Sequence, residues 1–167
     1  KAEGLRVRIL ARAYEKLIAY IDLHPREISG YGRVEDLGAE GFFITDIILL
    51  HQQDSAVETE ITEEDIAKFL TEMITRGDQP KFWRVWWHSH VNFGAYFSST
   101  DIYTARNFRP NEIPWRISIV GNKHHEFRVR FDRYDAGHPI AIDNLPLEVV
   151  FGADPAVLAA ARADIAV

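Results

Sequence analysis

The sequence predicts a single α/β domain in which helices pack on both sides of a central sheet. Segments with helical spacing of apolar residues alternate along the chain with segments rich in β-branched and aromatic residues. The length of 167 residues suits one domain. A domain of this size buries about two thirds of the surface that its unfolded chain exposes. No repeat, low-complexity tract or linker divides the chain.

The first half of the chain contains two expected helices. Residues 5–23 carry a helical stripe of apolar side chains, and Pro25 ends it. The second helix is expected from Glu63 to about Arg76, because Thr62 can cap it and acidic residues fill its first turn. Between these helices the composition predicts strands over residues 27–34, 41–50 and 57–61.

The second half is expected to begin with a largely buried strand over residues 81–90, which are rich in aromatic and β-branched side chains. A loop is expected over 92–97, followed by a helix from Thr100 to about Phe108 with Ser98 or Ser99 as its cap. The remaining expected elements are a strand pair over 117–120 and 126–134, joined by a Gly121-Asn122 turn, and a short helix over 155–165.

Composition narrows the possible partners. The chain is 47% hydrophobic and 26% charged, with a formal net charge of −6 at pH 7. This balance is typical of a globular protein and argues against nucleic acid or an anionic membrane as the main partner. No apolar run approaches the roughly 20 residues that span a bilayer. Cysteine is absent, which excludes a thiol nucleophile and a thiolate zinc site and is compatible with a reducing cytoplasm, the expected location.

One short stretch carries the chemistry. His88 and His90 flank Ser89 in an expected strand, where alternate side chains point to the same face. Ser98 and Asp101 follow after a short loop, so that Asp101 can return an oxygen ligand to the two imidazoles. Two histidines and one carboxylate, with a fourth position left to water, are the ligand set of a catalytic zinc site. The sequence therefore predicts a hydrolase.

Hydrolysis of a peptide bond also needs a base and a donor to the carbonyl oxygen. The Ser98 hydroxyl, at the start of the expected helix, is a candidate donor, although it could serve only as a helix cap. Glu27 is the best candidate base, since it starts an expected strand after a helix ended by proline. Glu35 and Glu40 are rivals, but each lies beside an expected turn. A His-x-His pair can also be merely structural.

These residues resemble the motif of the JAMM (MPN+) metalloprotease family. The family pattern is a Glu, then His-Ser/Thr-His, seven residues, Ser, two residues and Asp. It matches Glu27-Ile28-Ser29-Gly30 and the stretch from His88 to Asp101, and the Trp86-Trp87 pair resembles the aromatic stretch that leads into it. The resemblance covers residues from about 5 to 134. The chain departs from the family at Val91 and Phe97, where proline is common, and at Gly32 and Arg33, where leucine and glycine are usual.

The resemblance implies a cytidine-deaminase-like fold with three layers, in which helices flank a mixed central sheet. It implies one domain over residues 1–167, with a core over about 5–134 and a C-terminal extension over about 135–167. It further implies a Zn²⁺-dependent peptidase or isopeptidase that cuts at the C-terminal tail of ubiquitin or a ubiquitin-like protein through a zinc-activated water. The implied zinc ligands are His88, His90 and Asp101, with Glu27 as general acid and base and Ser98 as support for the oxyanion.

Several alternatives stay open. The same site could process sulfur-carrier proteins or small peptides. A non-catalytic MPN scaffold would keep the fold, but such scaffolds generally lose ligands. A non-haem iron oxygenase also uses two histidines and a carboxylate, in a different order along the chain. The aromatic residues Phe93, Tyr96 and Phe97 could form a wall for an extended substrate tail or could simply pack.

Overall fold

The structure is a computed structural model of the chain. It describes residues 4–50, 63–91, 94–95, 97–99, 102, 114–135, 137–138, 140–152 and 155–166. The strands are β1 (Val7–Leu10), β2 (Ser29–Asp36), β3 (Phe42–Leu49), β4 (Val85–His90), β5 (Trp115–Asn122), β6 (Phe127–Arg133), β7 (Ile140–Leu145) and β8 (Leu147–Val150). The α-helices with described bounds are α1 (Ala11–Leu23), α2 (Glu63–Thr75) and α4 (Pro155–Ile165), and two 3₁₀ turns are η1 (Gly38–Glu40) and η2 (Pro80–Phe82).

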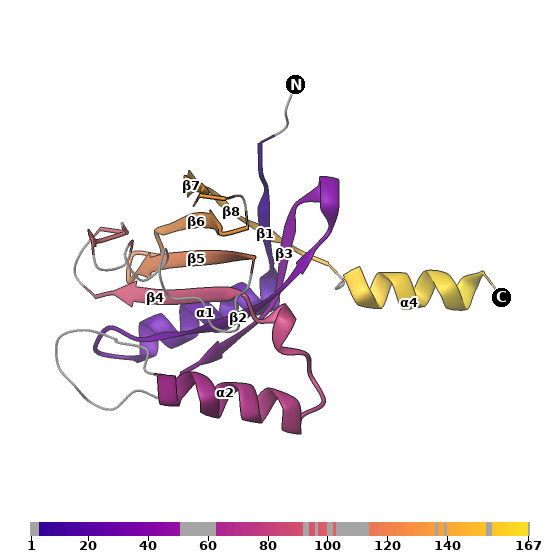
Figure 1. Cartoon of the computed structure of the whole chain (residues 1–167), viewed down its shortest axis with the longest axis horizontal. Coiled ribbons are helices and arrows are strands. Elements are labelled where there is room, and N and C mark those ends of the chain that lie inside the picture. The colour runs from indigo at the N-terminus through magenta and orange to yellow at the C-terminus, as the bar shows by residue number, and fades with distance from the viewer. Residues whose placement is uncertain are drawn as a thin grey trace.

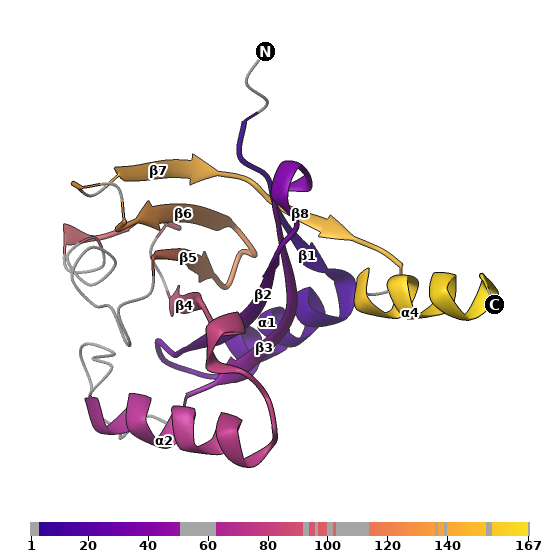
Figure 2. The same ribbon diagram turned by 45° about the vertical axis from the view of Figure 1, so that its right-hand side comes forward.

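The strands form one mixed sheet in the order β7-β6-β5-β4-β2-β3-β1-β8. β4 runs parallel to β5, and β1 runs parallel to both β3 and β8, whereas the other neighbours are antiparallel. Only Pro146 separates β7 from β8, yet these strands occupy the two ends of the order. The sheet must therefore curve strongly, and Figure 2 shows β7 passing over β6 and continuing into β8 beside β1.

Helix α1 covers one face of the sheet. Its buried residues Ala13, Leu17 and Ile21 recur every four positions, so they form one stripe against the sheet. This stripe belongs to the main hydrophobic core, which takes in side chains from β1, β2, β3, β4, β5 and β6. The ring of Tyr20 stacks on Trp87 of β4 with 5.9 Å between centroids. The main core thus joins α1 to the centre of the sheet, next to the histidine strand.

Helix α2 lies on the opposite face. In β2, Gly30 faces Trp87 on the α1 side of the sheet. Its neighbour Tyr31 therefore points to the other side, because successive residues of a strand alternate. Tyr31 packs with Phe69 and Met73 of α2 and with Trp83 in a second buried cluster. The Tyr31 and Phe69 ring centroids lie 4.6 Å apart. The predicted α/β fold, with a mixed sheet between helices, is confirmed (Figure 1).

The N-terminal segment differs from its predicted helix over residues 5–23. The helix begins only at Ala11, and the residues before it form β1. Val7 and Ile9 are buried while Arg8 between them is half-buried, which is the alternation of a strand. The hydrogen bonds of β1 go to β3 and β8 on either side. Both partners lie far away in the sequence, so the local pattern does not reveal the strand. Its apolar residues were instead assigned to the stripe of the helix that follows.

The turn between β5 and β6 also differs from the prediction of Gly121-Asn122. Both residues belong to β5, and the chain reverses over Lys123–Glu126. The Asn122 side-chain oxygen accepts the backbone N–H groups of His124 and Glu126 at 3.0 and 3.1 Å. His125 takes the left-handed backbone conformation, with φ of 59°. The asparagine therefore shapes the turn through its side chain, one residue before the turn begins.

Other predictions agree closely or lie outside the described residues. Strands β2, β3 and β6 and helices α2 and α4 fall where they are expected within about two residues, while β4 starts at Val85 because η2 takes Pro80–Phe82. The predicted strand over 57–61 and most of the predicted helix over 100–108 lie outside the described residues. Strands β7 and β8 were not anticipated. None of the helices in the described parts of the chain has both the length and the hydropathy that a membrane span requires.

Candidate functional site

The two histidines of the motif lie at the C-terminal end of β4. Because β4 runs between β2 and β5, both imidazoles are buried, with 3% exposure at His88 and 8% at His90. They point to the same face of the sheet, as alternation requires, and their ring centroids lie 5.1 Å apart with planes inclined by 77°. The two rings are close enough for one nitrogen of each to meet a common ion.

Aromatic contacts hold the first imidazole. Trp86 lies two residues before His88 on the same face, and its ring stacks on the imidazole with 4.8 Å between centroids and an angle of 17°. Phe97 approaches from the loop after β4, with its centroid 6.2 Å from that of His88. Trp86 was expected in a largely buried strand, and Phe97 in the loop that follows it. The structure shows that both contact His88.

Glu27 reaches the second imidazole. Its Oε1 lies 3.1 Å from Nδ1 of His90, across a separation of more than sixty residues in the sequence. The Glu27 side chain is 30% exposed, whereas that of His90 is 10% exposed. The carboxylate therefore lies at the rim of the site, in contact with both solvent and the buried ring.

The pairing of β2 with β4 produces this contact. Ser29 lies opposite His88 in the antiparallel ladder. Just before it, the Ile28 N–H donates to the Ser89 hydroxyl at 3.2 Å, and the Ser89 N–H donates to the Ile28 carbonyl at 2.9 Å. Ser89 thus holds the residue next to Glu27. In the sequence, Ser89 was quoted as part of the motif but given no role of its own. A hydroxyl on a buried strand indicates a side chain that needs a hydrogen-bond partner.

Ser98 lies at the start of a helical segment. Its carbonyl accepts the Ile102 N–H at 3.0 Å, and Ser99 is already helical. This is the backbone pattern of a helix N-cap residue, whose carbonyl takes the first intrahelical bond. The expected zinc ligand Asp101 lies outside the described residues, as do Phe93 and Tyr96. The functional roles of Glu27, Ser98 and the three ligands therefore stay predictions.

A divalent metal fits the part of the site that the structure describes. Among the described residues no three His, Cys, Asp or Glu side chains are placed to hold an ion together, and the third expected ligand, Asp101, lies outside those residues. The two imidazoles supply nitrogen donors of the kind that zinc prefers. Glu27 bonds to Nδ1 of His90, which leaves Nε2 as the ligand atom, and a carboxylate behind a ligating histidine is common at zinc sites.

The face of the sheet that carries His88 and His90 also carries buried polar residues on the neighbouring strands. On β5, Ser118 lies beside Trp86 and Asn122 beside His90 in the parallel register. Asp132 of β6 lies opposite Arg116 of β5 in the antiparallel ladder. Burial lowers the pKa of the Arg116 guanidinium, because desolvation disfavours its charge.

A two-pronged ion pair belongs to this polar face. Arg130 is 4% exposed and Asp132 is 1% exposed. Two nitrogens of the Arg130 guanidinium donate to the two oxygens of the Asp132 carboxylate at 2.9 and 3.0 Å. Sequence reasoning missed this buried pair, because charged residues alternate with apolar ones along β6, a pattern that is equally typical of a strand with one solvent-exposed face.

Comparison with known proteins yields a distant relative and a similar fold. No protein-family model matches the chain. The 26S proteasome regulatory subunit rpn11 of Schizosaccharomyces pombe is 27% identical over 96 residues, which are 58% of this chain and 31% of rpn11. The chain thus matches less than a third of the length of that relative. The solution structure of protein DSY2949 from Desulfitobacterium hafniense covers 89% of this chain and 94% of its own, with a TM-score of 0.58 and 11% identity, which shows the fold alone.

Proposed function

We propose, from the premise that this chain is a distant homologue of rpn11 and so of the MPN/JAMM family, that it is a zinc-dependent peptidase. Its substrate would be the peptide or isopeptide bond at the C-terminal tail of ubiquitin or a ubiquitin-like protein. One observation carries the proposal: a partly exposed carboxylate, Glu27, lies 3.1 Å from the second of two buried imidazoles that share a face of β4.

His88 and His90 would hold the metal together with Asp101. Their burial excludes competing water from the ring nitrogens, and the stack on Trp86 restricts rotation of the His88 ring. Zinc, when bound, supplies the polarisation of a carbonyl and lowers the pKa of water to about 7. The protein contributes a rigid pair of ligands on a central strand, which is the kind of support that a precise site needs.

Glu27 would move the protons. Peptide hydrolysis needs a group that takes a proton from the attacking water and later delivers it to the leaving nitrogen. The Glu27 carboxylate is suited to both steps, since it is accessible from solvent and lies within hydrogen-bond distance of the His90 ring. Its contact with Nδ1 of His90 keeps the carboxylate beside an expected metal ligand in the absence of substrate.

Ser98 would stabilise the charge that develops on the carbonyl oxygen. It lies at a helix start, one residue after Phe97, whose ring contacts His88. A hydroxyl at this place can donate to an oxyanion, and removing one such donor commonly lowers kcat by about a hundredfold to a thousandfold. Phe97 would line the path of an extended substrate tail next to the imidazole.

The test is cleavage of a substrate panel by the zinc-loaded protein. The panel contains ubiquitin and ubiquitin-like proteins with Gly-Gly tails, joined either to a lysine side chain or to a linear peptide, together with small-peptide and amino-acid conjugates. We expect cleavage after the terminal glycine of a modifier and only a small residual rate in a Glu27→Gln variant. Cleavage of only the small conjugates would favour a peptidase of the second kind. Full zinc occupancy without cleavage of any member would contradict the enzymatic proposal and favour a scaffold.

A further inference from the structure

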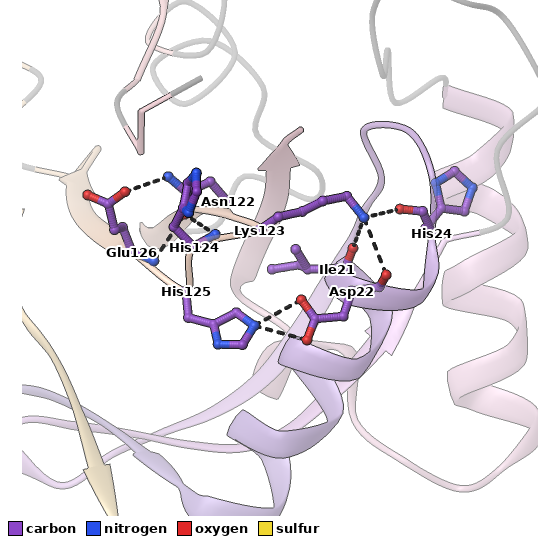
Figure 3. Close-up of polar contacts among 8 residues, drawn as sticks. All are labelled: Ile21, Asp22, His24, Asn122, Lys123, His124, His125 and Glu126. Atoms are coloured by element: carbon purple, nitrogen blue, oxygen red, sulfur yellow. Dashed lines mark hydrogen bonds and ion pairs between the residues drawn. The ribbon is translucent and has the colours of Figure 1, made fainter. Parts of the chain in front are cut away.

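Lys123 makes three hydrogen bonds to the end of helix α1. Its Nζ lies 3.1 Å from the Ile21 carbonyl oxygen, 3.3 Å from that of Asp22 and 2.8 Å from that of His24 (Figure 3). Lys123 is half-buried and lies in the turn between β5 and β6, about a hundred residues after α1. The turn of one hairpin is therefore joined to the C-terminus of a helix on another part of the chain.

The chemistry of this contact is specific to a cation with several donors. The last carbonyls of an α-helix have no partner within the helix, and they carry the negative end of the helix dipole. An ammonium group has three N–H donors and no acceptor, so one lysine can bind three such oxygens. Ile21 and Asp22 belong to the last turn of α1, and His24 follows its final residue. Lys123 thus serves as the C-terminal cap of α1.

The turn that carries Lys123 is itself well held. Asn122 accepts two backbone N–H groups of the turn and donates through Nδ2 to Glu126 at 3.0 Å. The His125 ring contacts both carboxylate oxygens of Asp22 through Nε2 at 2.9 Å, as Figure 3 shows. A second side chain therefore joins the same turn to the same end of α1, so the backbone that carries Lys123 is held in place by contacts other than its own.

The segment that follows α1 leads directly to Glu27. After His24 the chain makes a tight local contact, because the His24 ring Nδ1 lies 3.1 Å from the Arg26 backbone nitrogen and 2.9 Å from its carbonyl oxygen. Beyond Glu27, the backbone of Ile28 is held by Ser89. Glu27 therefore lies between two fixed points of the backbone. Lys123 binds the carbonyl of His24, three residues before it, and Ser89 binds Ile28, the residue after it.

We propose that Lys123 is a positioning residue for Glu27. By fixing the carbonyls of the α1 end, it holds residues 24–27 so that the Glu27 carboxylate stays at 3.1 Å from His90. The inference rests on the proposed function, in which Glu27 moves the protons. Loss of the ammonium group would release the carbonyls to water and let residues 24–27 shift, while the metal ligands on β4 would stay in place.

The experiment compares Lys123→Met with Lys123→Arg and with Lys16→Met. Methionine keeps most of the stem but removes the charge and the donors, and arginine keeps both. Lys16 is the matched control, because it lies on α1 and pairs with Asp46 at 3.1 Å on a half-exposed surface. Each variant is measured for zinc content, kcat and KM on the cleaved Gly-Gly substrate, and amide hydrogen exchange of peptides that cover residues 24–28.

For Lys123→Met we expect faster exchange over residues 24–28, unchanged zinc content, KM within about twofold, and kcat reduced about tenfold to a hundredfold, since small displacements of a catalytic group have effects of this size. Lys123→Arg should recover most of kcat. Lys16→Met should match the wild type in all four measurements. In a Glu27→Gln background, Lys123→Met should cause no further loss of the residual rate, because the lysine acts through Glu27.

Two results would overturn the inference. One is unchanged exchange over residues 24–28 in Lys123→Met. The other is a loss of kcat that persists in full in the Glu27→Gln background, which would show that Lys123 does not act through Glu27. Failure of the proposed function has a different signature, since a wild-type protein that cleaves no member of the panel would still report the exchange difference. The exchange measurement needs no turnover, so it decides the structural part of the inference alone.

Discussion

Ser89 makes two hydrogen bonds to the backbone of Ile28: its hydroxyl accepts the Ile28 N–H at 3.2 Å, and its own N–H donates to the Ile28 carbonyl at 2.9 Å. Both residues are buried, with 2% exposure at Ser89 and 4% at Ile28. This contact joins the histidine strand to the residue that follows Glu27. The middle residue of the His-Ser-His motif thus has a structural function that is separate from metal binding.

Replacing Ser89 by alanine should weaken the fold and the site together. The Ile28 N–H would lose the hydroxyl that accepts it in a buried place, which costs about 1–3 kcal/mol. We expect this decrease in the free energy of unfolding, measured in urea, and a lower kcat. Ser118→Ala is the control, since no hydrogen bond of its buried hydroxyl is seen in the described residues. Equal destabilisation of both variants would contradict the role given to Ser89.

Trp86 should determine how well His88 serves as a ligand. The indole stacks on the imidazole at 4.8 Å, and its Nε1 has no hydrogen-bond partner among the residues that the structure describes. Trp86→Phe keeps an aromatic face and should retain zinc affinity, whereas Trp86→Leu should weaken it about tenfold or more, the range seen when groups that orient a ligand are lost. Competition with a chromogenic chelator measures the affinity. Equal affinity in the two variants would show that the stack is unimportant.

Gly30 should not tolerate a side chain. A Cβ there would meet the Ile48 carbonyl oxygen and would lie 2.7 Å from Nε1 of Trp87. These two groups bond to each other at 3.1 Å across the glycine. We expect Gly30→Ala to lower the free energy of unfolding by about 3 kcal/mol, because overpacking of this kind displaces the backbone. Gly4→Ala is the control, since nothing lies within 4 Å of its added Cβ. A Gly30→Ala protein as stable as Gly4→Ala would contradict the crowding.

The buried pair of Arg130 and Asp132 should be sensitive to loss of one charge. Both side chains are at most 5% exposed, and the carboxylate accepts two guanidinium bonds. Asp132→Asn would leave the buried Arg130 cation with a neutral amide and the more distant, half-exposed Asp143 carboxylate at 3.7 Å, and breaking buried pairs costs about 3–5 kcal/mol. Thermal and urea unfolding measure the loss. The comparison is Asp135→Asn in the exposed pair with Arg133, which we expect to change stability little.

The candidate site predicts two classes of variant. Glu27→Ala should keep stoichiometric zinc and lose turnover, because the carboxylate is not one of the expected metal ligands and is the group proposed to move protons. His88→Ala and Asp101→Asn should lose both zinc and turnover. Elemental analysis after dialysis, with cleavage of the Gly-Gly substrate, separates the classes. Unchanged turnover in Glu27→Ala would reassign the base, and full zinc content in His88→Ala would refute the ligand set.

Much of the architecture was predictable because it follows from local spacing. The stripe of Leu17 and Ile21 predicted α1, and the aromatic run before His88 predicted a buried strand. Strand β1 was not predictable in the same way. Its four residues follow the same apolar pattern that continues into the helix, and only pairing with β3 and β8 makes them extended. Strands β7 and β8 depend on such partners as well.

The chain's own pattern of residues was sufficient to place His88 and His90 on one face of one strand, because alternation is a property of every strand. It was also sufficient to select Glu27 as a candidate. Only the folded chain brings Glu27 within 3.1 Å of His90, places Ser89 on Ile28 and joins Lys123 to the end of α1. Periodicity is set by neighbours in the sequence, whereas these contacts join segments sixty to a hundred residues apart, and their geometry exists only once the whole sheet has paired.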